Sequence, residues 1–247
     1  LTFFCLHHKM KKIWSNKRIE KRGTYHMMSY EEFVEKAEKD EEWAPGWEAI
    51  DEVFDHLYPN QQPKHFATNM TARAMFGGNE YLDGYSIYTS ANGYQHIVTY
   101  GMTNLYFEKD KYGQEWNRWG YEMTMKLPVE DVQDCMWALD VLSNMARYTY
   151  TTNRFFEPYQ LIGNKGQPIK LHTDTAITAL LTIADTEAHG VDTVYGRTDF
   201  IQLVGITQPE YEMLSNNVPR IKEFVEKLRK KYPNLETDLN RTESIVF

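Results

Sequence analysis

The strongest hydrophobic pattern in the chain lies in residues 177–207. An apolar, β-branched run at residues 177–184 is followed by polar and glycine-containing breakers, and a second apolar run covers residues 200–206. Between them, a short strand-like piece at residues 192–193 precedes a turn at residues 195–196. Apolar runs of this length between polar breakers are typical of strands buried on at least one face. We therefore expect this stretch to form the centre of a β-sheet.

Four further segments upstream predict strands. Residues 85–89 alternate in the manner of a half-buried strand, and with residues 94–100 across an Asn-Gly turn they predict a hairpin. Residues 65–68 predict a short strand, and the alternation of residues 119–127 predicts another. A last strand is expected at residues 244–247.

Apolar residues at spacings of three and four predict the helices. The Ser-x-x-Glu capping box at residues 29–32 predicts a helix that runs to about residue 42. Further helices are predicted at residues 47–57, 129–149 and 219–231, with a short one beginning at Gln208, and residues 155–175 are read as a loop. The chain shows no internal repeat and no linker, so it predicts one α/β domain over residues 29–247. Residues 1–28 are expected to be a disordered basic tail or a mis-assigned start.

Charge is distributed unevenly along the 247 residues. Residues 1–23 carry seven Lys or Arg and one Glu, a balance of +6, whereas the whole chain has a formal charge of −8. The remaining residues therefore carry −14. An acidic body disfavours binding to nucleic acid and accommodates a basic protein partner more easily. Tyr and Trp number 17 and 6, and both types are enriched at protein interfaces.

Several classes of protein are disfavoured by what the sequence lacks. No run approaches the roughly 20 apolar residues of a membrane span, and no secretion signal is recognised at the start. The only cysteines are Cys5 and Cys135, so a disulfide framework is not expected and a reducing cytoplasm fits. We expect a cytoplasmic protein that binds neither membrane nor nucleic acid.

The histidines and aspartates offer a catalytic alternative. His172 and Asp174, with His189 and Asp192 nearby in sequence, could bind a metal or act as a base and its orienting partner in a hydrolase. No recognised metalloprotease, nucleophile-elbow or phosphate-loop motif accompanies them. We therefore expect no catalytic residue, no metal and no cofactor. His96 lies in an apolar strand and is interpreted as a core histidine.

A dense group of aromatic residues is the best candidate for a binding surface. Tyr100, Tyr106, Tyr112 and Trp116 fall within 17 residues of one another, in and after the second hairpin strand. Some of these rings are expected to pack in the core, since apolar bodies are normally buried. The others predict contact with a protein partner.

Five segments of the chain, taken in order, resemble the Suppressor of fused family. The fifth is the pattern Gly-x-x-x-Phe-Ile-Gln-Leu-Val-Gly-Ile-Thr at residues 196–207. The other four are residues 82–88, 96–106, 119–127 and 142–150. Each is weak alone, but together they cover roughly residues 47–207.

This resemblance implies a single domain built as a mixed β-sheet sandwich flanked by helices, without established enzymatic chemistry. Animal members bind transcription factors by holding a short peptide as an added strand between two domains, and single-domain bacterial relatives resemble immunity proteins. The resemblance places Tyr106 at the border of the peptide-binding face. We expect a protein-binding antitoxin whose partner is a basic toxin domain, or alternatively a scaffold that binds a peptide by strand addition.

Overall fold

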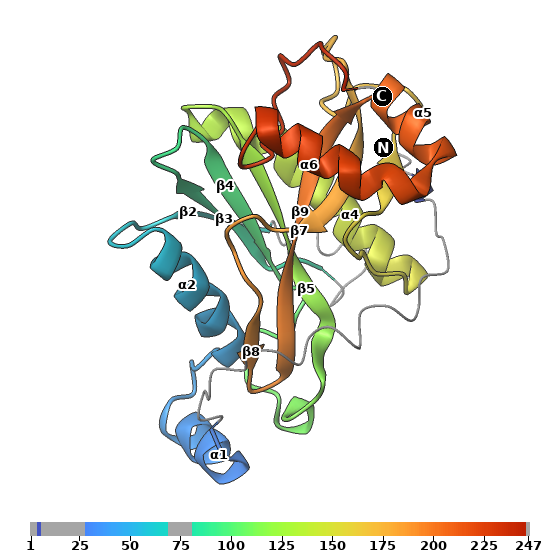
Figure 1. Ribbon diagram of the computed structural model, residues 1–247. Coiled ribbons are helices and arrows are strands. Elements are labelled where there is room, and N and C mark those ends of the chain that lie inside the picture. The colour runs from blue at the N-terminus through green and yellow to red at the C-terminus, as the bar shows by residue number, and fades with distance from the viewer. Residues whose placement is uncertain (1–3, 6–27, 69–80, 246–247) are drawn as a thin grey trace.

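Over the residues that the structure describes, the central sheet holds nine strands. The computed structural model describes residues 4–5, 28–68 and 81–245 (Figure 1). The strand order is β1-β6-β7-β9-β5-β4-β3-β2, and β8 pairs with β9 outside this path. The strands are β1 (Phe4–Cys5), β2 (Lys64–Ala67), β3 (Gly84–Thr89), β4 (Gln95–Tyr100), β5 (Trp116–Leu127), β6 (Leu161–Gly163), β7 (Ile177–Ala184), β8 (Val191–Thr193) and β9 (Gly196–Thr207).

The central pair of strands is β5 and β9, which run parallel, while the neighbouring pairs are antiparallel. Both strands have twelve residues. The expectation that residues 177–207 form the centre of the sheet is confirmed, and β7 has the predicted bounds. The predicted hairpin is confirmed as β3 and β4. However, β3 is buried on both faces and not on one, because helices cover the two sides of the sheet.

The helices are α1 (Tyr30–Lys39), α2 (Pro45–Leu57), α4 (Met136–Thr152), α5 (Gln208–Asn216) and α6 (Ile221–Lys231). The capping box predicted at the start of α1 is present: Ser29 accepts from the Glu32 N–H, and the Glu32 side chain accepts from the Ser29 N–H. Glu35 and Lys39 pair one turn apart later in the same helix. These local signals explain why the sequence located α1 so closely.

Helices cover both faces of the sheet (Figure 1). One face packs on α4 through alternate residues of the central strands, such as Met123, Met125 and Leu203. The opposite face packs on α2 at one end, through Val98 and Phe200 among others. At its other end this second face packs on α5 and α6. The architecture is therefore a mixed sheet between helical layers, as the fold class predicted.

Two sequence predictions about these elements are wrong. The long helix predicted at residues 129–149 is a 3₁₀ turn at Val132–Cys135 followed by α4, because the Asp131 side chain accepts from the Gln133 N–H and starts a tighter turn first. The predicted loop at residues 155–175 contains β6, which is only three residues long and gains its hydrogen bonds from β7. A strand so short carries no periodic signal of its own.

The predictions for the two ends of the chain can be compared with the structure only over the described residues. Ser244 and Ile245 are not in a strand, and the rest of the predicted final strand lies outside the described residues. Most of the predicted basic tail also lies outside them. Within it, Phe4–Cys5 form β1 against β6, and the Met28 carbonyl accepts a hydrogen bond from Tyr112.

Candidate partner-binding surface

The loop between β4 and β5 carries the aromatic residues that the sequence proposed for partner binding. The side chain of Tyr106 is 52% exposed and that of Trp116 is 42% exposed. Tyr112 is half-buried. Tyr100, by contrast, is completely buried at the end of β4. Three of the four predicted residues therefore reach the surface, and the fourth is part of the core.

A buried glutamate holds the start of this loop. Glu122 of β5 is fully buried, and its carboxylate accepts hydrogen bonds from the backbone N–H groups of Gly101 (3.1 Å), Met102 (3.3 Å) and Thr103 (2.9 Å). The hydroxyls of Thr99 and Thr103 donate to it at 2.6 and 2.7 Å. A buried acceptor with five donors fixes the chain closely, because any displacement leaves polar groups unpaired.

Burial decides the charge state of this glutamate. Loss of water raises the pKa of Glu122 to about 7, although the hydroxyls of Thr99 and Thr103 and the neighbouring backbone N–H groups oppose the rise. The described structure gives this carboxylate only neutral donors and no cationic side chain. Its protonation therefore changes near neutral pH.

The residues just before Tyr106 are clamped against α2. The Leu105 carbonyl accepts from the N–H groups of Gly46 and Trp47 at 2.9 and 3.3 Å. A Cβ on Gly46 would lie 1.9 Å from the Asn104 carbonyl oxygen, so only glycine permits this approach. The Asn104 N–H donates to the Asn117 side chain at 2.8 Å, which closes the loop at its far end.

A β-bulge presents Trp116. The register between β5 and β9 shifts between Trp116 and Tyr121, and Arg118 and Gly120 have φ values of 55° and 81°. A Cβ on Gly120 would lie 2.9 Å from the indole of Trp116, so the ring rests on bare backbone. Arg118 donates to the Gly101 carbonyl at 3.0 Å, which ties the bulge to the start of the loop. Bulges commonly re-aim side chains at functional sites.

Aromatic rings connect Tyr106 to α2. Trp47 stacks on Tyr100 with ring centroids 4.4 Å apart, and its ring lies 5.1 Å from His65 and 6.5 Å from Tyr106. The Tyr100 hydroxyl donates to Asp51 at 2.7 Å. Partial burial raises the pKa of Asp51, with Tyr100 acting against the rise. Tyr100 is thus the buried member of this group of aromatic rings.

The neighbouring surface of α2 is strongly acidic. Glu48, Asp51, Glu52 and Asp55 line an open hollow of about 590 Å³ together with His56. We call these four carboxylates the acidic face of α2. Lys36 pairs with Glu48 at 3.3 Å. The hollow and the exposed rings together suit a basic protein surface.

Tyr112 connects the loop to α1. Its hydroxyl donates to the Met28 carbonyl at 2.6 Å, and its ring lies 5.1 Å from Phe33 and 5.3 Å from Tyr30. Tyr30 is itself 41% exposed. We define the candidate surface as Tyr106, Tyr112 and Trp116 with Tyr30 and the acidic face of α2.

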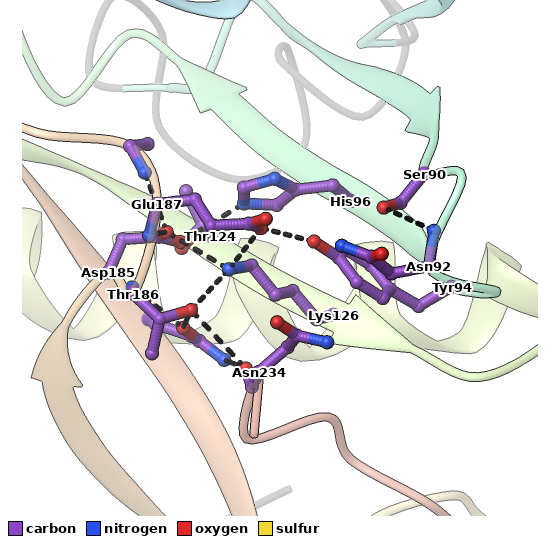
Figure 2. A network of polar contacts seen from close by, with 12 residues as sticks. Ser90, Asn92, Tyr94, His96, Thr124, Lys126, Asp185, Thr186, Glu187 and Asn234 are labelled. Carbon is purple, nitrogen blue, oxygen red and sulfur yellow. Dashed lines mark hydrogen bonds and ion pairs between the residues drawn. The ribbon is translucent and has the colours of Figure 1, made fainter. Parts of the chain in front are cut away.

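Figure 2 shows a second polar cluster. It lies on the sheet face away from α4, because Lys126 follows Met125, which packs on the α4 side. Lys126 of β5 is completely buried and pairs with Asp185 at 3.2 Å and Glu187 at 2.8 Å. His96 bonds Asp185 through Nε2 at 3.0 Å and the Tyr58 hydroxyl through Nδ1 at 2.8 Å. We call these residues the buried charge network.

The geometry of this network indicates a structural role. Burial acts to raise the pKa of Asp185, but His96 and Lys126 outweigh it and hold that pKa below its usual range. Both ring nitrogens of His96 are partnered, which confirms its interpretation as a core histidine. Neither described cavity is lined by these residues. Sequence reasoning missed the network because its acidic members lie about 60 to 90 residues from their partners.

The catalytic alternative receives no support from the arrangement of its residues. His172, Asp174, His189 and Asp192 are all exposed, and Asp192 pairs with Arg197 at 3.5 Å. Over the described ranges, no hydrogen bond joins either histidine to a carboxylate, and no cluster of three or more His, Cys, Asp or Glu could hold a metal ion.

The described helices also include none that is long and apolar enough to cross a membrane.

Comparison with known proteins identifies the fold and the family. The family model described as Suppressor of fused protein (SUFU) matches residues 78–242. The human Suppressor of fused homolog is 24% identical over 172 residues, which cover 62% of this chain and 34% of the human protein. The mouse homolog is 25% identical over the same length. The chain thus spans about a third of the length of these curated relatives.

Solved structures of related proteins share the fold of this chain. A chain from the crystal structure of the Sufu–Fu complex aligns with a TM-score of 0.66 at 22% identity, covering 81% of this chain and 92% of that one. Drosophila Suppressor of Fused gives 0.64 at 22% identity, over 81% of this chain and 51% of that one. A SUFU homolog from Neisseria gonorrhoeae gives 0.56 at 16% identity, over 82% and 98%. The match to the family model covers well over half of the sequence, and this chain therefore belongs to the Suppressor of fused (SUFU) family.

Proposed function

We propose that this chain is a non-catalytic protein-binding domain that neutralises a partner by covering its active surface. The partner that fits best is a basic protein, such as a toxin domain, which would make this chain an immunity protein. The observation that carries the proposal is the pair of exposed rings, Tyr106 and Trp116, on a loop that the interior holds rigidly. A relative in the same family was solved in a complex with another protein, Fu, which supports a role in protein interaction.

The physical argument rests on pre-organisation. Exposed aromatic rings stabilise an interface most when their backbone is already ordered, because binding then costs little conformational entropy. Glu122 orders one end of the loop and Asn117 the other. The rings are therefore presented at a fixed position before any partner arrives.

Charge adds speed and selectivity. The acidic face of α2 lies beside Tyr106 through the Trp47 stack. Such a surface would steer a cationic partner, for example a nuclease whose own surface binds phosphate, and raise the association rate. It would repel acidic proteins and nucleic acid.

The test is affinity capture from the native host with tagged protein, followed by mass spectrometry. Wild type, Tyr106→Ala and Phe155→Ala would be compared at two salt concentrations. Phe155 is 46% exposed and follows α4 in the chain, so it is an aromatic control of similar exposure that is not part of the loop. One dominant basic partner, lost with Tyr106→Ala and weakened by salt, supports the proposal. Capture that is indifferent to both changes contradicts it.

A peptide-binding scaffold is the second candidate, and one feature favours it. β2 ends the sheet, and among the described strands none pairs with its outer edge. An extended peptide could add there as a further strand. Captured short peptides in place of a folded protein would favour this reading.

A further inference from the structure

A cleft at the far end of β5 is separate from the candidate surface. It encloses about 280 Å³ between four segments: the end of β5, the start of α4, residues 170–175 and residues 237–240. Leu127, the last residue of β5, lines it, whereas Trp116 begins the same strand. Twelve residues of strand span about 35–40 Å. A ligand in this cleft therefore cannot contact the loop that carries Tyr106.

The walls of the cleft are fixed by the fold. The Thr175 hydroxyl donates to the Leu239 carbonyl at 2.5 Å, and this bond joins the two loop walls. The Thr237 N–H donates to the Lys126 carbonyl at 2.8 Å, which anchors one of these loops to β5. These bonds make the hollow part of the folded domain.

The lining combines an indole with carboxylates that have no cationic partner. Trp137 packs partly against the core on the α4 side and also lines the cleft. Asp134, Asp174 and Asp238 line the same hollow, with Lys170 as the single cation. Across the described residues, neither Asp134 nor Asp174 makes an ion pair, and Lys170 pairs with neither. Asp238 accepts the Asn240 N–H through Oδ1 at 2.9 Å, but no ion pair among the described residues neutralises it, so the cleft carries more negative than positive charge.

We propose that this cleft binds a guanidinium group. Three carboxylates against one ammonium favour a cation. A planar guanidinium can lie against an indole and direct its N–H donors to carboxylates at the same time, which a compact ammonium group cannot do as well. The volume is slightly below that of drug-sized pockets, so it suits a single side-chain-sized group. The group could belong to an arginine of a protein or to a free small guanidine.

The test uses the full chain and NMR of its tryptophan indole N–H groups, with the Trp137 signal assigned from Trp137→Phe. Three probes, each with a single positive charge, would be titrated: N-acetyl-arginine amide, methylguanidine and N-acetyl-lysine amide. The Trp137 signal should move with both guanidines and much less with the lysine probe. Tighter binding of the arginine amide points to a protein side chain, and tighter binding of methylguanidine to a free guanidine. No movement with either guanidine overturns the proposal.

Matched variants locate the binding. Asp134→Asn and Asp174→Asn should each weaken the binding of the guanidines by roughly tenfold, since each removes a charged acceptor. Lys170→Met should strengthen the binding of the guanidines, because it removes the competing cation. Asp140→Asn is the control, as Asp140 is exposed on α4 and does not line the cleft. Equal binding by Asp134→Asn, Asp174→Asn and Asp140→Asn would exclude the cleft. Tyr106→Ala should leave this binding unchanged, so the cleft and the proposed neutralising surface can fail independently.

Discussion

Glu122 and Asp185 are both buried carboxylates, yet their surroundings move their pKa values in opposite directions. Glu122 meets only neutral donors, and burial raises its pKa to about 7. Asp185 meets Lys126 and His96, which outweigh burial and lower its pKa. The first carboxylate holds a loop that reaches the candidate surface, and the second ties β5 to the segment after β7. The comparison separates a group that supports a surface from one that supports the fold.

The largest effect should come from breaking the buried charge network. Lys126→Met leaves Asp185 buried without its ammonium partner, so we expect a loss of about 3–5 kcal/mol in the free energy of unfolding. Chemical denaturation monitored by tryptophan fluorescence measures it. The matched control is Lys111→Met, whose pair with Asp110 is exposed and screened by solvent, so its loss should change stability little. Similar losses for the two variants would show that the network does not stabilise the fold.

The next effect is a pH dependence that belongs to Glu122. Its folded pKa of about 7 lies above the unfolded value of 4.5, so the folded state binds the proton more tightly. Stability from this group is therefore present below pH 4.5 and is lost as pH rises through 7, by up to about 3 kcal/mol. In Glu122→Gln this contribution is absent. The stability of wild type relative to the variant should fall between pH 4.5 and pH 8.

The control for this prediction is Glu115→Gln, an exposed glutamate in the same loop. Its stability relative to wild type should be nearly constant over the same pH range. A constant difference for Glu122→Gln as well would mean that the carboxylate does not change protonation on folding. The loop would then be held by geometry alone.

These two regions also show how far the sequence could predict the structure. The alternation of residues 119–127 located β5, and its apolar positions face α4. The same alternation could not show that the intervening polar residues, including Glu122 and Lys126, are buried. Their partners come from distant segments, and the covering helices bury them. Polar residues in a strand normally indicate a solvated face, and only tertiary structure reverses that inference.

The aromatic residues show the same limit. Tyr100 and Tyr106 lie six positions apart in the sequence, and both were predicted to be contact residues. Trp47 covers Tyr100, because Gly46 allows α2 to approach the loop, whereas Tyr106 follows the clamp and stays exposed. The bulge that presents Trp116 depends on Arg118 and Gly120 adopting positive φ, of which only the glycine gives a sequence signal.

A smaller effect on stability, but a large one on binding, is expected at Trp116. Trp116→Ala should reduce the binding free energy for the captured partner by about 2 kcal/mol or more, which is typical of an aromatic anchor. It should change the free energy of unfolding little, because the ring is 42% exposed. Isothermal titration calorimetry measures the first quantity and thermal unfolding the second. Phe155→Ala, which removes a ring of similar exposure, should leave the affinity unchanged. Loss of affinity in both variants would indicate a general effect of removing surface aromatics.

The smallest effect should come from the acidic face of α2. Glu52 and Asp55 are exposed and line the hollow, so their charges act through solvent over a distance. Glu52→Gln combined with Asp55→Asn should lower the association rate of a basic partner by roughly two- to fivefold at low salt, leave the dissociation rate nearly unchanged and flatten the salt dependence. Stopped-flow measurements at two ionic strengths separate these quantities. Neutralising Glu130 and Glu226 instead removes the same net charge from exposed sites outside the hollow. If that control slows association equally, the total charge of the domain steers the partner; if it does not, the partner approaches over α2, beside the rings that the buried Glu122 helps to hold in place.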